Sequence, residues 1–176
     1  MNATATTRLA LFDLDNTLLT GDTDVLWCDF LIACGRIDAA TFAAANADME
    51  QRYLAGKATA AEFCVFYVSL LKGISYRDGE VMRQQFFTEW IRPRICDDAR
   101  ALVEKHRTLG DVLILTTATN RFITELTAQD LGIENLIAIE TESVNDIFTG
   151  KTIGVLNMRE GKVVRLTQWL FEKGWE

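Results

Sequence analysis

Two carboxylates follow a short apolar run near the start of the chain. Residues 9–19 have the sequence LALFDLDNTLL, which places Asp13 and Asp15 directly after an expected buried strand over residues 8–12. At this spacing Asp13 can attack a phosphorus atom, while Asp15 protonates the leaving oxygen and later takes a proton from water. The alternative is a plain turn after a strand, because Asp, Asn and Thr are common in turns. The complete D-x-D-x-T pattern, with Thr17 holding the turn, favours chemistry.

The elements around these carboxylates predict an α/β fold. Residues 21–92 carry helix caps and glycine stops but no convincing strand, and Pro93 marks the end of this stretch. Helices are expected near 97–109, 120–131 and from 161 onward, strands at 112–115 and 136–139, and a hairpin at 146–157 around Thr149-Gly150. The β-α-β alternation predicts a parallel sheet with right-handed crossovers. We therefore expect a core of residues 1–20 and 93–176, interrupted by an all-helical insert of residues 21–92.

The first motif resembles that of the haloacid dehalogenase (HAD) superfamily, in the subgroup similar to phosphoserine phosphatases and histidinol-phosphate phosphatases. The resemblance extends over the whole chain. It implies a Rossmann-like α/β core, with the insert after the first strand forming a helical cap over the site. It also implies an Mg²⁺-dependent phosphatase that acts on a small phosphorylated metabolite through an aspartyl-phosphate. Asp13 would be the nucleophile and Asp15 the acid/base, and both would contribute to the metal site.

The resemblance also implies residues that bind the phosphoryl group. The segment VLILTTATN offers Thr117 for the second motif, with Thr116 as a poorer alternative. The segment EGKVVRL offers Lys162 at the start of a helix, where a lysine can neutralise Asp13 and an incoming phosphate together, and the helix dipole adds to its effect. Asn120 follows the second motif and is a candidate phosphate contact, although it is equally well explained as a helix cap.

Residues of the insert are candidates for substrate recognition. Asp24 and Trp27 lie just past the nucleophile loop and are the residues of the insert expected to face the site, with a core position as the alternative for Trp27. The acids Asp22, Asp24 and Asp38 would suit a phosphate ester that carries an amine, such as phosphoserine or histidinol phosphate.

The fourth motif of the family has no counterpart in this sequence. In the family it is a pair of acids after one further strand, and at least one of them binds Mg²⁺. We expect either a fragment or truncated product, or an incomplete metal site, and therefore little turnover by residues 1–176. The alternative function is a non-catalytic remnant that binds phosphate weakly or self-associates. The strand at 8–12 is then expected to have an uncovered edge, which would favour a homo-oligomer.

Composition excludes several other functions. The net charge of −7 without a basic patch argues against a nucleic-acid partner. No apolar run approaches the length of a membrane span. The four cysteines, Cys28, Cys34, Cys64 and Cys96, form no C-x-x-C pair, which argues against a zinc site. Scattered thiols and an N-terminus without a secretion signal indicate a cytoplasmic protein. His106 lies on a polar helix and is expected to face solvent.

Overall fold

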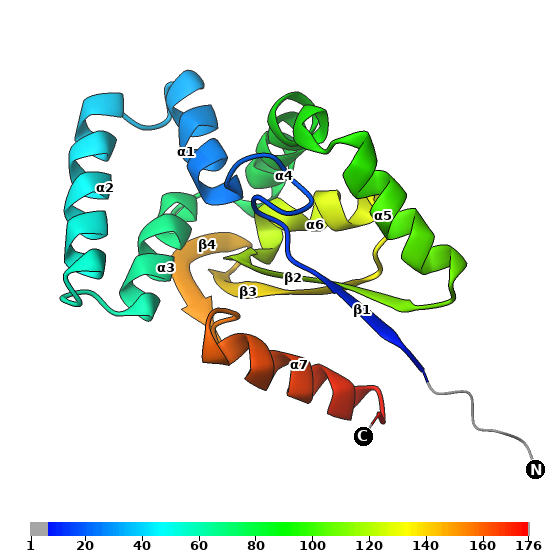
Figure 1. The fold of residues 1–176 in the computed structure, drawn as a ribbon. Coiled ribbons are helices and arrows are strands. Elements are labelled where there is room, and N and C mark those ends of the chain that lie inside the picture. Colours follow the sequence, from blue (N-terminus) through cyan, green and yellow to red (C-terminus); the bar gives the residue numbers. More distant parts are fainter. Residues whose placement is uncertain (1–6, 176) are drawn as a thin grey trace, which may run out of the picture.

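The computed structural model describes residues 7–175, and the strands within them form one four-stranded sheet (Figure 1). The strand order is β1-β2-β3-β4, with bounds β1 Leu9–Phe12, β2 Val112–Asn120, β3 Asn135–Val144 and β4 Ile147–Ile153. Strands β1, β2 and β3 are parallel, whereas β4 is antiparallel to β3. The predicted α/β class with a parallel sheet is confirmed. Residues 1–6, on which part of the localisation prediction was based, and residue 176 lie outside the described part.

Strand β1 lies at one edge of this sheet. It pairs with β2 in parallel register, from Leu9 opposite Val112 to Phe12 opposite Leu115. Within residues 7–175 no strand lies on its other side, and the Leu11 side chain is 45% exposed. The buried residues Ala10 and Phe12 alternate with Leu11, as expected for a strand with one face in the core.

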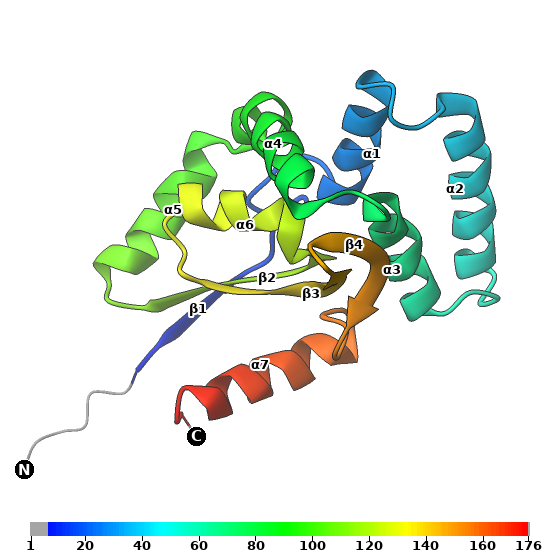
Figure 2. The same cartoon turned by 180° about the vertical axis from the view of Figure 1, so that it is seen from behind.

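The two faces of the sheet are covered differently. Helices α5 (Asp97–Thr108) and α6 (Arg121–Asp130) lie over one face, and α7 (Glu160–Glu172) lies below the other (Figures 1 and 2). Helix α5 begins with two acids, Asp97 and Asp98, and ends with basic residues, which suits the helix dipole. No helix of the described residues is both long and apolar enough to cross a membrane.

A run of helices between β1 and α5 forms the insert. Its members are α1 (Thr23–Ala33), α2 (Ala39–Leu54), α3 (Ala60–Val68), the short 3₁₀ helix η1 (Ser69–Leu71), α4 (Tyr76–Phe86), a π turn η2 (Phe87–Ile91) and a 3₁₀ turn η3 (Arg92–Arg94). A capping box begins α3, because Thr59 and Glu62 each accept from the other's backbone N–H. The helical insert after the first strand is confirmed, whereas its exact domain bounds at 21 and 92 stay a prediction.

The β3–β4 hairpin fastens the insert to the core. The backbone N–H of Gly73 donates to Phe148 O at 2.9 Å, and Phe148 N donates to Ile74 O at 3.0 Å. Tyr76 N donates to Asp146 O at 2.6 Å, directly before α4. These hydrogen bonds hold the segment before α4, and the first residue of α4, against the hairpin.

Some predicted bounds were wrong. Strands β2 and β3 each extend several residues beyond the predicted 112–115 and 136–139. The hairpin exists, but it turns at Asn145-Asp146, both with positive φ, and Thr149-Gly150 lies inside β4. Asn and Asp tolerate this left-handed region better than most residues. The alternation around Thr149 is that of a strand, and the residues that form the turn are Asn145-Asp146, directly before β4.

Candidate active site

The loop after β1 places the two carboxylates at the end of that strand. Leu14 O accepts hydrogen bonds from the backbone N–H groups of Thr17, Leu18 and Leu19, at 3.0 to 3.1 Å. Asn16 has a φ of 56°, and its N–H donates to Gly21 O at 2.9 Å. This closed turn keeps the residues after Phe12 at the carboxyl end of the strand, the edge at which parallel α/β sheets bind ligands.

Lys162 contacts Asp13. Its Nζ lies 2.8 Å from Asp13 Oδ1, and the two side chains are 33% and 46% exposed. Lys162 is in the first turn of α7, so the positive end of the helix dipole adds to the charge of the ammonium. The two residues are far apart in sequence, and the fold brings them together at a position that remains open to solvent.

A network of hydroxyl groups surrounds Asp15. Asp15 Oδ1 accepts from the Thr23 N–H at 2.7 Å and from the Thr23 hydroxyl. Asp15 Oδ2 accepts from the Thr119 hydroxyl at 3.1 Å and from the Thr117 hydroxyl at 3.4 Å. Both oxygens of Asp15 are thus engaged by protein donors, whereas the Asp13 carboxylate is partly open. The two acids have different surroundings, as different chemical roles require.

Asp24 joins this network from helix α1. The Thr119 hydroxyl lies 3.3 Å from Asp24 Oδ2, so it bridges Asp15 and Asp24. Burial raises the pKa of Asp24 well above its usual value, and the charges of Asp22 and Asp15 raise it further. Burial likewise raises the pKa of Asp15, against the opposing effect of the Thr23 hydrogen bond. A raised pKa favours the protonated acid, which is the form that can give a proton to a leaving group.

The remaining predicted residues occupy distinct places. Thr117 is fully buried, and its hydroxyl accepts from Thr119 N while facing Asp15. Asn120 is the N-cap of α6, and its Oδ1 accepts from Ile123 N at 3.3 Å. The capping alternative for Asn120 therefore accounts for this oxygen. The Thr116 hydroxyl contacts Asn157 rather than Asp15, and it accepts a hydrogen bond from Asn157 Nδ2 at 3.0 Å.

Trp27 lies in the core. It is 2% exposed, and its ring packs 5.3 Å from Phe30 and 4.9 Å from Phe86, between centroids. Its indole N–H has no hydrogen-bond partner among the described residues. Trp27 has too little exposed surface in this position to contact a substrate. The core alternative for Trp27 therefore accounts for its position.

Three contributors to the site were missed from the sequence. Thr23 and Thr119 bind Asp15, and buried Asn157 connects the segment before α7 to the strands. Thr119 follows Thr117 by two positions, so strand alternation places both on one face and could have identified it. Thr23 and Asn157 act through tertiary contacts that carry no local pattern. His106, which was expected to face solvent, is partly exposed, and its Nδ1 lies 2.7 Å from Asp111 Oδ2.

The site can supply oxygen ligands to a cation. Among residues 7–175 no three His, Cys, Asp or Glu side chains are grouped to hold a metal. The Asp13 carboxylate is 46% exposed and available, and Mg²⁺ commonly uses one or two carboxylates, waters and substrate phosphate. The donor set therefore fits an ion shared with a bound phosphate, but not a site built from protein side chains alone.

Comparison with known proteins gives a consistent family assignment. The model of the family described as haloacid dehalogenase-like hydrolase matches residues 10–176. A Neisseria meningitidis serogroup C protein named histidinol-phosphatase is 36% identical over 168 residues, covering 95% of this chain and 76% of that protein. A Mycobacterium tuberculosis protein named phosphoserine phosphatase is 28% identical over 162 residues, covering 89% of this chain and 52% of that protein.

Solved structures share the fold. The crystal structure of a protein of unknown function from Bordetella pertussis Tohama I is 40% identical, with a TM-score of 0.91, over 96% of this chain and 76% of that one. A substrate-bound phosphoserine phosphatase is 17% identical, with a TM-score of 0.65, over 97% of this chain and 73% of that one. At that identity the second likeness supports the fold alone.

Proposed function

The chain belongs to the haloacid dehalogenase-like hydrolases and is a phosphatase of that family, and we propose that it hydrolyses a small phosphorylated metabolite through an aspartyl-phosphate on Asp13. The observation that carries this proposal is the 2.8 Å contact between Lys162 Nζ and Asp13 Oδ1, beside the hydrogen-bonded carboxyl of Asp15. A partly open carboxylate next to a cation suits attack on a phosphate, because the cation offsets the repulsion between the two anions.

Two half-reactions account for hydrolysis. In the first, an Asp13 oxygen bonds to phosphorus, the ester P–O bond breaks, and Asp15 gives its proton to the leaving oxygen. In the second, Asp15 takes a proton from a water whose oxygen bonds to phosphorus, and the Asp13–phosphorus bond breaks to release inorganic phosphate. The raised pKa of Asp15, caused by burial, supports the first role, and its hydrogen bonds fix the carboxyl in place.

The proposed cofactor is Mg²⁺. The Asp13 carboxylate and the backbone carbonyl oxygen of Asp15 would hold it, together with water and the substrate phosphate. When bound, the ion would supply further neutralisation of the charge between Asp13 and the phosphate. The expected dependence is measured as phosphate release with Mg²⁺ and with a chelator.

The proposed substrates are phosphate esters that carry an amine, of the phosphoserine or histidinol phosphate type. Two of the three acids considered for this role serve as helix caps, since Asp22 accepts from Val25 N and Asp38 accepts from Thr41 N. Asp24 is left as the candidate, because Thr119 links it to Asp15. An ammonium bound at Asp24 would offset the cost of ionising an acid that is partly shielded from solvent.

Asp24→Asn tests this substrate class. The variant should lose the preference for phosphoserine or histidinol phosphate over glycerol phosphate, which lacks an amine. The measurement is kcat/KM for each ester, with Asp38→Asn as the control because that acid caps an exposed helix. An unchanged preference in Asp24→Asn would remove Asp24 from substrate recognition.

The nucleophile assignment is tested by Asp13→Asn. An amide is a poor nucleophile, so release of p-nitrophenol from p-nitrophenyl phosphate should be abolished. Asp15→Asn should slow release by about 10²- to 10⁴-fold, the usual worth of a positioned acid/base. Turnover that survives Asp13→Asn would exclude Asp13 as the nucleophile.

Phosphate binding without turnover is the alternative function. It is favoured by the lack of a three-residue metal cluster within the described residues. The two functions differ in one experiment: a protein that binds orthovanadate but releases no p-nitrophenol at millimolar Mg²⁺ has the alternative function.

Self-association is proposed through β1. Its outer edge has no neighbouring strand among residues 7–175, and free edges pair readily with other strands. Leu11→Lys should reduce any oligomer seen by light scattering, because an edge lysine disfavours pairing. A wild-type protein that stays monomeric at all concentrations would contradict this proposal.

The cytoplasm is the proposed compartment, and neither nucleic acid nor membrane is a proposed partner. The four cysteines are free thiols in the described structure. Four thiols that react with Ellman's reagent in the unfolded, unreduced protein would support this placement, whereas disulfides would oppose it.

A further inference from the structure

Helix α7 carries Lys162 but is not held in place by a packed face. None of its residues is fully buried. Val163, Val164 and Phe171 are 68%, 44% and 84% exposed. Burial of apolar side chains normally fixes a helix on a sheet. Because Leu166, Trp169 and Leu170 are only half-buried, this contribution is limited for α7, and polar contacts help to set the position of Lys162 relative to Asp13.

The first such contact lies in the segment just before the helix. Asn157 is fully buried, and its Nδ2 donates at 2.8 Å to both Thr117 O and Ile137 O. It also lies 3.0 Å from the Thr116 hydroxyl. One amide thus ties the segment to two neighbouring strands, to β2 at Thr117 and to β3 at Ile137. Since Asn157 has no exposed surface, any effect it has on bound phosphate must pass through other residues.

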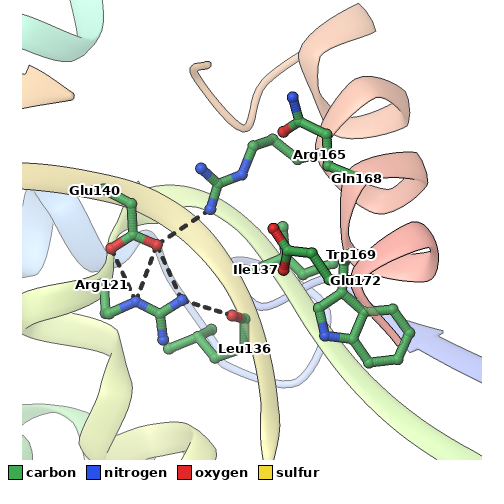
Figure 3. A pocket seen from close by; sticks show the side chains of 8 residues that line it. All are labelled: Arg121, Leu136, Ile137, Glu140, Arg165, Gln168, Trp169 and Glu172. Atoms are coloured by element: carbon green, nitrogen blue, oxygen red, sulfur yellow. Dashed lines mark hydrogen bonds and ion pairs between the residues drawn. The ribbon is translucent and has the colours of Figure 1, made fainter. Parts of the chain in front are cut away.

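The second contact lies one turn into the helix. Arg165 Nη2 is 3.1 Å from Glu140 Oε1 on β3 and 3.4 Å from Ala138 O. Figure 3 shows Arg165 reaching from α7 to Glu140, which Arg121 holds from the other side. Arg121 Nε lies 3.0 Å from both Glu140 oxygens, and its Nη2 donates to Leu136 O at 2.8 Å. Glu140 is therefore a fixed acceptor rather than a mobile surface acid.

We propose that Asn157 and Arg165 are positioning residues that hold Lys162 against Asp13. The two anchors lie on either side of Lys162 along the chain. Asn157 attaches the helix to β2, which carries Thr117, and to β3, and Arg165 attaches it to β3. A lysine side chain has many rotamers, so its amine stays near one carboxylate oxygen only when its backbone is fixed. The proposal rests on the proposed function only in giving Lys162 a role toward phosphate, because the geometry itself is independent of any substrate.

The test measures the Lys162 amine directly, without substrate. The purified protein is acetylated briefly with acetic anhydride, and mass spectrometry gives the rate at each lysine. Asp13→Asn is the positive control, because it removes the ion-pair partner. Asn157→Asp keeps the shape of the side chain but points an acceptor at two carbonyl oxygens, and Arg165→Met removes the other anchor. Each should raise the Lys162 rate by about two- to fivefold, the range for loss of a partly exposed ion pair.

Matched controls separate positioning from loss of structure. Asn135→Asp removes a similar bond, from Asn135 Nδ2 to Leu113 O at 2.9 Å, at the other end of the β2–β3 pair. Arg100→Met removes the ion pair between α5 and α6, in which Arg100 Nη2 lies 2.6 Å from Asp130 Oδ2. Both should lower the unfolding midpoint without changing the Lys162 rate relative to Lys105. If Asn157→Asp does not fold, Arg165→Met still decides the question.

The outcomes distinguish this proposal from the proposed function. An unchanged Lys162 rate in the folded variants, while Asp13→Asn raises it, would overturn the positioning role. A raised Lys162 rate supports it. If that rise leaves orthovanadate affinity unchanged, the role of Lys162 toward phosphate fails and the positioning role stands.

Discussion

Replacing Lys162 by methionine removes the ammonium that lies 2.8 Å from Asp13 Oδ1 but keeps an unbranched side chain. We expect weaker binding of phosphate mimics and almost no change in stability. The reason is that the ammonium contacts only the Asp13 carboxylate in the free protein, whereas it also contacts a phosphate dianion when phosphate is bound.

The geometry sets the magnitude. At the 2.8 Å separation of Lys162 and Asp13, Coulomb's law gives about 1.5 kcal/mol in water and about 6 kcal/mol at an effective dielectric constant of 20. The side chains are 33% and 46% exposed, so solvent screening places the interaction near the lower limit. The stability contribution should be about 0–1 kcal/mol. If a phosphate oxygen lies at a similar distance from the Lys162 amine, the lower limit of about 1.5 kcal/mol applies to each unit of phosphate charge. Removing the ammonium should then lower the affinity about tenfold per unit charge.

The assay is calorimetric titration with orthovanadate, paired with thermal unfolding of the same samples. Lys162→Arg should retain most of the affinity, because it keeps the charge. Lys105→Met on α5 is the control, since Lys105 is an exposed lysine on the opposite face of the sheet. Orthovanadate affinity that is equal in Lys162→Met and the wild type would refute the reasoning, as would an equal loss in Lys105→Met.

Two further predictions concern stability. In Gly79→Ala the new Cβ would lie 2.8 Å from Phe122 Cζ. Overpacking costs about 1–3 kcal/mol, which exceeds the gain of about 1 kcal/mol in helix propensity. Urea denaturation should therefore show a lower free energy of unfolding, and a higher one would contradict the packing. Hydrogen bonds from Arg8 and then His106 hold the pKa of Asp111 below its usual 3.8. A carboxyl whose pKa is lowered by folding adds stability above its unfolded-state pKa. This stability is lost as pH falls through the folded-state pKa. The unfolding midpoint of the wild type should therefore fall more steeply below about pH 4 than that of Asp111→Asn, and parallel curves would exclude this contribution.

The sequence was most informative where chemistry and local structure coincide. Asp13 and Asp15 follow an apolar run, and a strand that ends in polar residues can be recognised from a few positions. Lys162 was identified from the resemblance, because nothing local distinguishes it from a surface lysine. The capping box at Thr59 and Glu62 was predictable because both partners lie within one turn.

Other features depend on contacts between distant parts of the chain. Asn157 binds carbonyl groups of β2 and β3, and its neighbours in sequence give no sign of this. Trp27 was expected near the site because of its position in sequence, whereas packing against Phe30 and Phe86 decided its place. The turn of the last hairpin was misplaced because Thr149-Gly150 has turn composition, although Asn145-Asp146 adopts the left-handed conformation.

The hydrogen bonds that join Gly73, Ile74 and Tyr76 to the β3–β4 hairpin also bear on how the chain folds. They connect segments that are distant in sequence, so the entropy of closing that loop is lost before either segment gains from the contact. The hairpin and the start of α4 should therefore open and close as one cooperative unit. In native-state hydrogen exchange, the amides of Gly73 and Phe148 should share one opening free energy. The amides of α2, a helix without a single buried residue, should exchange through smaller and separate fluctuations.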